Sequence, residues 1–248
     1  VSHAIERELL DSDVRPERIT YLPHAIDVTR FAPVTDAGRR ALRLSLGLPP
    51  NATTAVFVGR LSREKGLMEL MEAWTDLAAP GVYLVVVGPD MPGHPWDVGP
   101  AARALVAERG LSSSVRFVGG VSPNEVPKWM QAADLAVQPS HFEAFGIAAA
   151  EAMAIGLPVV ASDVGGFRDY IQDGINGFRV PPHDPQALGQ ALRRLLCNDE
   201  LRRLIGQAAR VTALQFDERH VLEAFAQLLD RLTEHGSLAG GPQATSPP

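Results

Sequence analysis

Short apolar runs that recur between helix-like segments constrain the fold of this chain more than any other feature of its sequence. Each run is a few residues long and rich in valine, leucine and alanine, as expected of strands buried on both faces of a sheet. Strands that alternate with helices predict an α/β fold with a doubly wound parallel sheet and right-handed crossovers. The runs are Ala55–Val58, Val82–Val87, Val115–Val118, Leu135–Val137, Pro158–Ala161 and Gly177–Val180.

The chain divides into three parts around this pattern. Residues 1–52 are interpreted as the end of a preceding domain and a linker, with a short strand near Ile19–Leu22. Residues 53–235 form the regular α/β domain, which closes with helices near 199–214 and 217–234. The tail 236–248, rich in Gly, Pro, Ser and Ala, is predicted to be disordered. Because the first residue is Val1 rather than Met, we expect a fragment or a processed chain.

Composition excludes several classes of partner. The net charge is −6, from 23 basic and 29 acidic residues, and no basic stripe suggests nucleic acid. No apolar run is long enough to span a bilayer, and this half gives no indication of membrane association. The single cysteine, Cys197, excludes an intramolecular disulfide and is consistent with a reducing, cytoplasmic compartment.

The first candidate for chemistry is the segment Gly59–Gly66, which directly follows a predicted strand. Ligands of open parallel sheets bind beyond the carboxyl ends of the strands. The segment matches neither the P-loop nor the dinucleotide fingerprint. Arg63 and Glu64 are interpreted as charges of a solvated turn. For Arg60 and Lys65, which lie beside glycines that let a ligand approach the backbone, an anion site is the favoured interpretation.

The second candidate follows the run Leu135–Val137. An alanine-rich helix is predicted to begin near Phe145, so that the free amides of Phe145, Gly146 and Ile147 would attract negative charge. Glu143 precedes this helix and Glu151 lies within it, on different faces. Taken alone, Glu143 would be interpreted as a helix cap and Glu151 as the partner of a surface cation. Beside a cationic loop, contacts with one extended ligand are favoured.

No metal or triad chemistry is predicted. No cluster of His, Cys, Asp and Glu has the spacing of a metal site, and no Ser/His/Asp arrangement stands out. His141 lies at the end of a predicted strand, where packing or capping is favoured over a functional role. His24 and His183 are interpreted as structural.

Taken together, these segments resemble the glycogen-synthase-like family 4 glycosyltransferases of the GT-B fold, over nearly all of residues 1–235. The most specific element is Glu143 to Glu151, which is similar to that family's Glu-x7-Glu motif. Two departures occur, since His24-Ala25 stands where Asn-Gly is usual and Asp169 where Glu is common. The other matching segments are Gly59–Gly66, 156–162, 164–166 and 173–182.

The resemblance implies a Rossmann-like donor-binding domain and a role for each candidate residue. The donor would be a UDP-, GDP- or ADP-sugar, with no cofactor and no metal, and the transfer would retain the anomeric configuration. The base, the sugar and the acceptor stay open. Arg60 and Lys65, with Gly59, would hold the diphosphate. Glu143 would approach the sugar, and Glu151 would accept hydrogen bonds from the ribose hydroxyls. The sugar and distal phosphate would be bound by the amides at Phe145, Gly146 and Ile147, and the base would be contacted by backbone near Val118.

The resemblance also implies an N-terminal acceptor domain that these residues do not contain. We therefore expect a hexosyltransferase that is inactive as this isolated half. Two alternatives remain. One is a non-catalytic nucleotide-sugar-binding module or subunit that needs a partner acceptor domain. The other is a hydrolase or epimerase that uses Glu143 and Glu151 as an acid/base pair, which the cationic loop disfavours.

Overall fold

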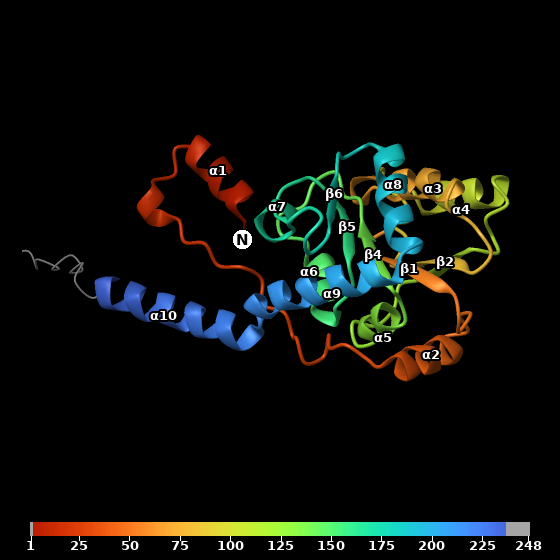
Figure 1. Cartoon of the computed structure of the whole chain (residues 1–248). Helices are drawn as coiled ribbons and strands as arrows, with labels where there is room; N and C mark the ends of the chain where they lie inside the picture. Colours follow the sequence, from red (N-terminus) through yellow and green to blue (C-terminus); the bar gives the residue numbers. More distant parts are fainter. Residues whose placement is uncertain (1, 237–248) are drawn as a thin grey trace, which may run out of the picture.

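A computed structural model of the chain describes residues 2–236, with side chains as far as Thr233 (Figure 1). The tail predicted to be disordered lies outside these residues, apart from Gly236, which is the last residue of a helix. Within the described part, no helix combines the length and the apolar character that crossing a bilayer requires.

A six-stranded sheet forms the centre of the molecule, and all of its strand pairs are parallel. The strand order is β3-β2-β1-β4-β5-β6, which is that of a doubly wound Rossmann-like fold. Every apolar run of the sequence contributes to a strand, so the predicted fold class is confirmed. The strands are β1 (Thr53–Val58), β2 (Val82–Val87), β3 (Val115–Gly119), β4 (Leu135–Gln138), β5 (Val159–Ser162) and β6 (Phe178–Val180).

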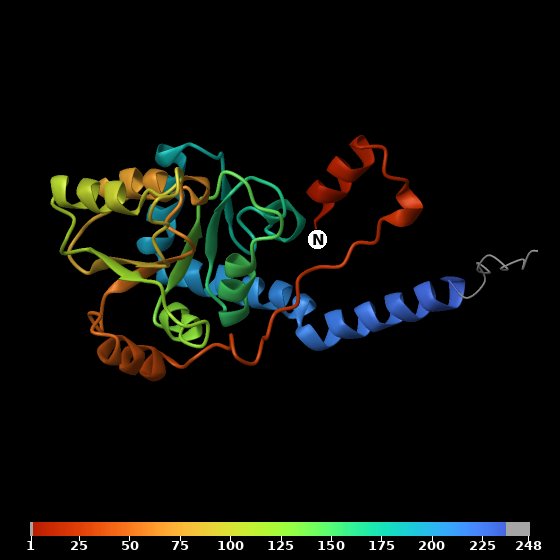
Figure 2. The same cartoon turned by 180° about the vertical axis from the view of Figure 1, so that it is seen from behind.

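Helices cover both faces of the sheet, as Figures 1 and 2 show from opposite sides. Successive side chains of β1 alternate between the two cores: Ala55 and Phe57 belong to one and Val56 to the other. This alternation explains why the strands are apolar throughout. One core includes residues of α3 (Leu67–Thr75), α4 (Gly99–Glu108) and α8 (Pro185–Leu196), and the other residues of α5 (Val126–Gln131), α6 (Ile147–Ile155) and α7 (Phe167–Tyr170).

Both ends of the described chain leave the sheet domain on the same side (Figure 1). The N-terminal segment contains α1 (His3–Asp11) and the short helix η1 (Pro16–Arg18), but no strand at Ile19–Leu22, where the sequence predicts one. The two helices expected near the C-terminus are present as α9 (Asp199–Ala213) and α10 (Glu218–Gly236), joined by η3 (Leu214–Phe216). Ile26 bridges to Asp217 where the two segments meet.

Helix α2 (Asp36–Ser45) is bonded to the sheet domain although the sequence places it in the linker region. Arg43 is 5% exposed and donates to Asp134 Oδ2 at 2.6 Å and to the carbonyls of Ala52 and Ala132, each at 2.7 Å. Asp134, just before β4, also accepts from Arg39 at 3.0 Å and from the amide of Thr54 at 2.7 Å. The ion pair therefore joins α2 to the starts of β1 and β4.

Replacement of Arg43 by alanine should destabilise the domain strongly. The change leaves Asp134 without its nearest cation and leaves buried carbonyl groups without a donor, which together cost about 3–5 kcal/mol. Arg40→Ala, at an exposed position of the same helix, is the matched control and should change the free energy of unfolding by less than about 0.5 kcal/mol. Urea unfolding of both variants measures the difference, and equal effects would contradict this role of Arg43.

Candidate functional site

The point where the sheet changes its winding direction brings two loops together. β1 and β4 are hydrogen-bonded neighbours, with Ala55 opposite Leu135, although long stretches of chain separate them. β2 and β3 extend the sheet on one side of this pair, and β5 and β6 extend it on the other. Their crossovers therefore leave in opposite directions and open a crevice beyond the carboxyl ends of β1 and β4, the usual ligand site of such sheets.

The loop after β1 lies directly against the end of β4. It contains a short helix, η2 (Arg63–Lys65), followed by Gly66 at φ +67°. A Cβ atom on Gly66 would overlap the carbonyl oxygen of Pro139, so both the positive φ and the close approach require glycine. The amide of His141 donates to the carbonyl of Glu64 at 2.7 Å. The first and second candidate segments of the sequence are thus in direct contact.

Lys65 and Glu143 form an ion pair across this contact. Lys65 Nζ lies 2.6 Å from Glu143 Oε2, and their side chains are only 20% and 17% exposed. Ser140 Oγ donates to the same carboxylate oxygen at 3.3 Å. The structure therefore brings a cation from the β1 loop next to a carboxylate from the β4 loop, in a partly desolvated position where charge-assisted contacts are strong.

Arg60 is placed differently. Its guanidinium pairs with Glu64 within the same loop, and its side chain is 54% exposed. Glu64 is half-buried, so the interpretation of Glu64 as a solvated charge is wrong: it is the partner of Arg60. Of the two predicted cations, Lys65 contacts the β4 loop, whereas Arg60 lies at the outer edge of the β1 loop.

The helix predicted to begin near Phe145 begins at Ile147, because Gly146 adopts φ +89° and interrupts the helical path. The Phe145 side chain is buried among Tyr170 and Phe216, and it has a core role. Within residues 2–236, the amides of residues 145–148 donate no hydrogen bond. Free amides at the start of a helix form a site for anions, and this one lies within a few residues of Glu143.

Two further residues support this loop: Gly165, from the matching segment 164–166, and Tyr170, which sequence reasoning missed. Gly165, after β5, lies so close that a Cβ atom would overlap the carbonyl oxygen of Glu143. Buried Tyr170, in α7, has its hydroxyl 3.0 Å from the carbonyl oxygens of both Phe145 and Gly146. Burial raises the pKa of Tyr170, and Glu143 and Asp169 raise it further, so the hydroxyl stays protonated and donates to the loop.

Glu151 lies within α6, about one turn after the helix begins at Ile147, whereas Glu143 precedes the helix. Burial raises the pKa of the Glu151 carboxyl from 4.5 to about 7, and Arg30 partly opposes the shift. Within the described residues its carboxylate accepts no hydrogen bond. A half-buried carboxyl group with a raised pKa and without a partner is typical of a ligand site. Arg30, which sequence reasoning missed, comes from the segment before α2.

The remaining predicted residues lie at the ends of neighbouring strands. Gly59 follows β1, and its amide donates to the carbonyl of Val87 at 3.0 Å. Val118 lies in the edge strand β3 at a bulge, since Val86 pairs with Phe117 and Val87 with Gly119. A bulged residue leaves ladder pairing locally disrupted. Backbone groups near Val118 are thus at the carboxyl edge of the sheet, where the base of a nucleotide would have to be contacted.

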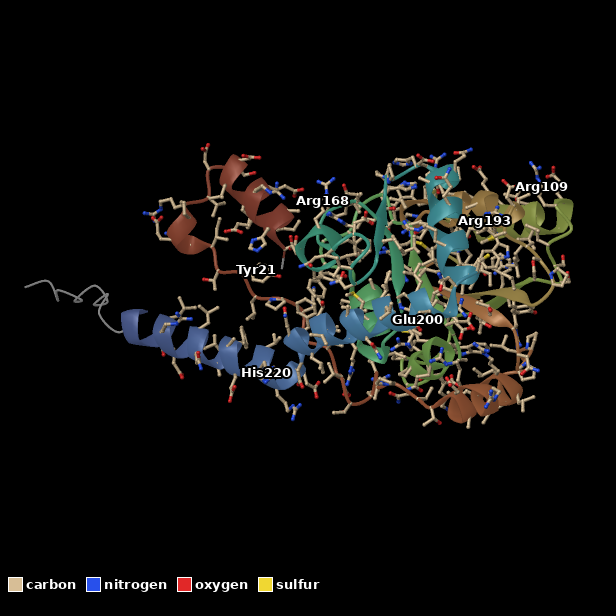
Figure 3. All side chains as sticks on the ribbon, in the orientation of Figure 1. Tyr21, Arg109, Arg168, Arg193, Glu200 and His220 are labelled. Carbon is tan, nitrogen blue, oxygen red and sulfur yellow. The ribbon has the colours of Figure 1, made fainter. Side chains whose placement is uncertain are left out.

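A cluster of possible metal ligands also lies at this edge, which the sequence did not indicate. One nitrogen each of His141 and His183 and one carboxylate oxygen of Glu69 lie within 4.8 Å of one another. The spacing of His, Cys, Asp and Glu along the sequence indicates no metal site, and the structure brings these three residues together from distant positions. The three residues come from three different elements, so no local motif marks them. Figure 3 draws all described side chains as sticks on the ribbon.

Comparison with known proteins agrees with this geometry. The family model described as "Glycosyl transferases group 1" matches residues 38–212. D-inositol 3-phosphate glycosyltransferase of Jonesia denitrificans is 34% identical over 232 residues, which cover 91% of this chain and 54% of that protein. The corresponding protein of Xylanimonas cellulosilytica is 37% identical over 222 residues, with 87% and 52% covered. The chain thus spans about half the length of these curated relatives.

Solved structures show the same fold. Sucrose-phosphate synthase from Thermosynechococcus elongatus matches with a TM-score of 0.84 at 30% identity over 95% of this chain and 58% of that one. Anabaena HepE, in complex with UDP and glucose, matches with a TM-score of 0.85 at 27% identity, covering 92% and 61%. A C-terminal domain of a group 1 glycosyl transferase from Francisella tularensis has a TM-score of 0.71 at 29% identity, covering 77% of this chain and 97% of that domain. The chain therefore belongs to the group 1 glycosyl transferase family, and its fold is that of the C-terminal half of a GT-B glycosyltransferase.

Proposed function

We propose that this chain is the donor-binding half of a retaining glycosyltransferase, which moves a hexose from a nucleoside diphosphate sugar to an acceptor hydroxyl. The observation that carries the proposal is the meeting of Lys65, Glu143 and the free amides before α6 at the switch point of the sheet. The resemblance to HepE supports a nucleotide donor, since that protein is solved with UDP and glucose.

The chemistry of glycosyl transfer explains these residue types. Departure of a nucleoside diphosphate leaves negative charge on the phosphates and oxocarbenium character on the sugar. Lys65 and the amides of residues 145–148 supply positive potential for the leaving group without a metal, and Arg60 can join them by leaving Glu64. Preorganised charge of this kind is typically worth about 3–4 kcal/mol per contact in the transition state. Glu143, released from Lys65, would face the sugar.

Glu151 and Val118 would bind the nucleoside. A carboxylate accepts from both hydroxyls of a ribose, and Glu151 has no such donor within the described residues. Backbone groups at the Val118 bulge, at the same edge of the sheet, would contact the base. Because backbone contacts do not depend on side-chain identity, the shape of the loop would determine which of UDP, GDP and ADP binds.

The acceptor would bind to a separate N-terminal domain. The chain spans about half of its curated relatives, and α10 carries an exposed apolar stripe outside the sheet domain: Leu222, Phe225, Leu229 and Leu232. These positions recur at helical spacing on one face. Such a stripe could pack against a further domain, and we infer that turnover requires this N-terminal domain. The test is to supply the N-terminal half: nucleotide binding without turnover even then would favour a non-catalytic module.

Lys65→Ala should weaken the binding of a nucleoside diphosphate to this chain. Loss of one charge-assisted contact costs about 1.5–3 kcal/mol, or roughly tenfold to a hundredfold in Kd. Calorimetry with UDP, GDP and ADP measures the effect, after melting curves show that the variant is folded.

Arg63→Ala is the matched control for this experiment. Arg63 is an exposed cation of the same short helix, so its loss changes the loop's charge without touching the Lys65–Glu143 pair. Its Kd should remain within about threefold of wild type. If both variants bind equally well, or if none of the three nucleotides binds wild-type protein, the proposed diphosphate site is wrong.

Glu151→Gln should stabilise the chain at alkaline pH. Because the folded-state pKa is raised to about 7, ionisation opposes folding, and the Glu151 contribution to stability falls as pH rises from the unfolded value through 7. Glutamine removes this cost of about 1–3 kcal/mol. Urea unfolding should therefore show a gain near pH 8 that vanishes towards pH 5. A gain that is independent of pH would contradict the shift.

A further inference from the structure

Three elements of the sheet domain bring two imidazoles to one carboxylate. Glu69 lies in the first turn of α3, His141 follows β4, and His183 lies between β6 and α8. His141 Nε2 is 2.9 Å from Glu69 Oε1, and His183 Nδ1 is 3.6 Å from the same oxygen. The centroids of the two imidazole rings are 3.8 Å apart, and the ring planes are tilted by 42° to each other.

The donor set and its dimensions match a transition-metal site. Zn²⁺ binds imidazole nitrogen and carboxylate oxygen at about 2.0–2.2 Å in tetrahedral geometry, and two histidines with one glutamate form a known ligand set. Tetrahedral ligands at these lengths are about 3.3–3.5 Å apart. The two measured distances, 2.9 and 3.6 Å, lie on either side of this value.

The backbone of His183 is held in an unusual conformation. His183 has φ +61°, and within residues 2–236 only Asp13 is another non-glycine residue with positive φ. Such a conformation is uncommon outside glycine and needs support from its surroundings. Its side chain is 61% exposed, so burial of the ring does not supply the support. The positive φ occurs in the turn before α8, and the His183 ring there lies beside His141 and 3.6 Å from Glu69.

We propose that Glu69, His141 and His183 bind a divalent transition-metal cation, with Zn²⁺ as the best match. The ion would join the loops after β4 and β6 to α3 and would keep one coordination position open towards solvent on the side of His183. None of the three residues is among those proposed to bind the donor, so the site does not rest on the proposed function. His141 shares the β4 loop with Glu143, and a bound ion would stabilise the contact of this loop with α3 and with the loop after β6. Without an ion, His141 is hydrogen-bonded to Glu69, and His183 lies beside them.

Metal titration of the untagged full chain tests the proposal. The protein is stripped with chelator and carries Cys197→Ser, since the exposed thiol of Cys197 is itself a metal ligand. Calorimetry with zinc chloride should give one site per chain, and cobalt chloride should give the visible absorption of a tetrahedral ion. At a hundredfold excess over Kd, zinc should raise Tm by about 5–10 °C.

Two variants and a control assign the site. His183→Asn removes an imidazole while keeping a residue that tolerates positive φ, and Glu69→Gln keeps a polar group beside His141. Each should weaken zinc binding by more than about tenfold, since even outer-shell changes cost that much. His220→Asn, on exposed α10 away from the cluster (Figure 3), should bind as tightly as wild type.

Each result decides the matter. One zinc per chain that is lost in His183→Asn and in Glu69→Gln, but kept in His220→Asn, supports the site. Absence of zinc binding, or binding that neither variant weakens, overturns it, and so does equal weakening in the control. Melting curves of the metal-free variants exclude unfolding as the cause, because exposed His183 should tolerate replacement without a fall in Tm.

Discussion

The direct hydrogen bonding of β1 to β4 is the constraint on which the rest of the molecule depends. It makes neighbours of two loops that are far apart along the chain, and it places both at the point where crossovers diverge. At the amino ends of both strands, Arg43 and Asp134 reinforce the pairing by joining α2 to the strand starts. At the carboxyl ends, Gly66 has no Cβ atom and so lets the β1 loop contact Pro139. The β1–β4 pairing, the buried Arg43–Asp134 ion pair and the absence of a side chain at Gly66 therefore together place Lys65 beside Glu143.

The sequence predicts the frame of the site because the frame follows from periodic features. Doubly buried strands must be apolar, so all six runs could be found, and a parallel sheet places the segments after all of them at one edge. The sequence does not predict that β1 and β4 are neighbours or that Lys65 pairs with Glu143, and both are findings of the structure. Contacts of Glu143 and Glu151 with different parts of one ligand stay a prediction.

What the sequence could not predict depends on single backbone conformations and on contacts between distant residues. The start of α6 is at Ile147 because Gly146 takes a left-handed conformation, which no pattern of side chains requires. Glu64 pairs with Arg60 of the same loop, a contact that the residue types alone do not indicate. The cluster of Glu69, His141 and His183 depends on the approach of α3 to two loops and on the φ of one histidine. Residues that hydrogen-bond to the loop backbone, such as Tyr170, can be identified only when the positions of the carbonyl groups they bind are known.

The Lys65–Glu143 pair has a consequence for discrimination among anions. Because the two side chains neutralise each other at 2.6 Å, an incoming phosphate must compete with a carboxylate that is already in contact with the ammonium group. A monophosphate would reach Lys65 with a single phosphate group, whereas a diphosphate would bring two groups that can reach Lys65 and the α6 amides together. In the proposed donor site, the pair would therefore compete with the ligand and favour diphosphates over monophosphates.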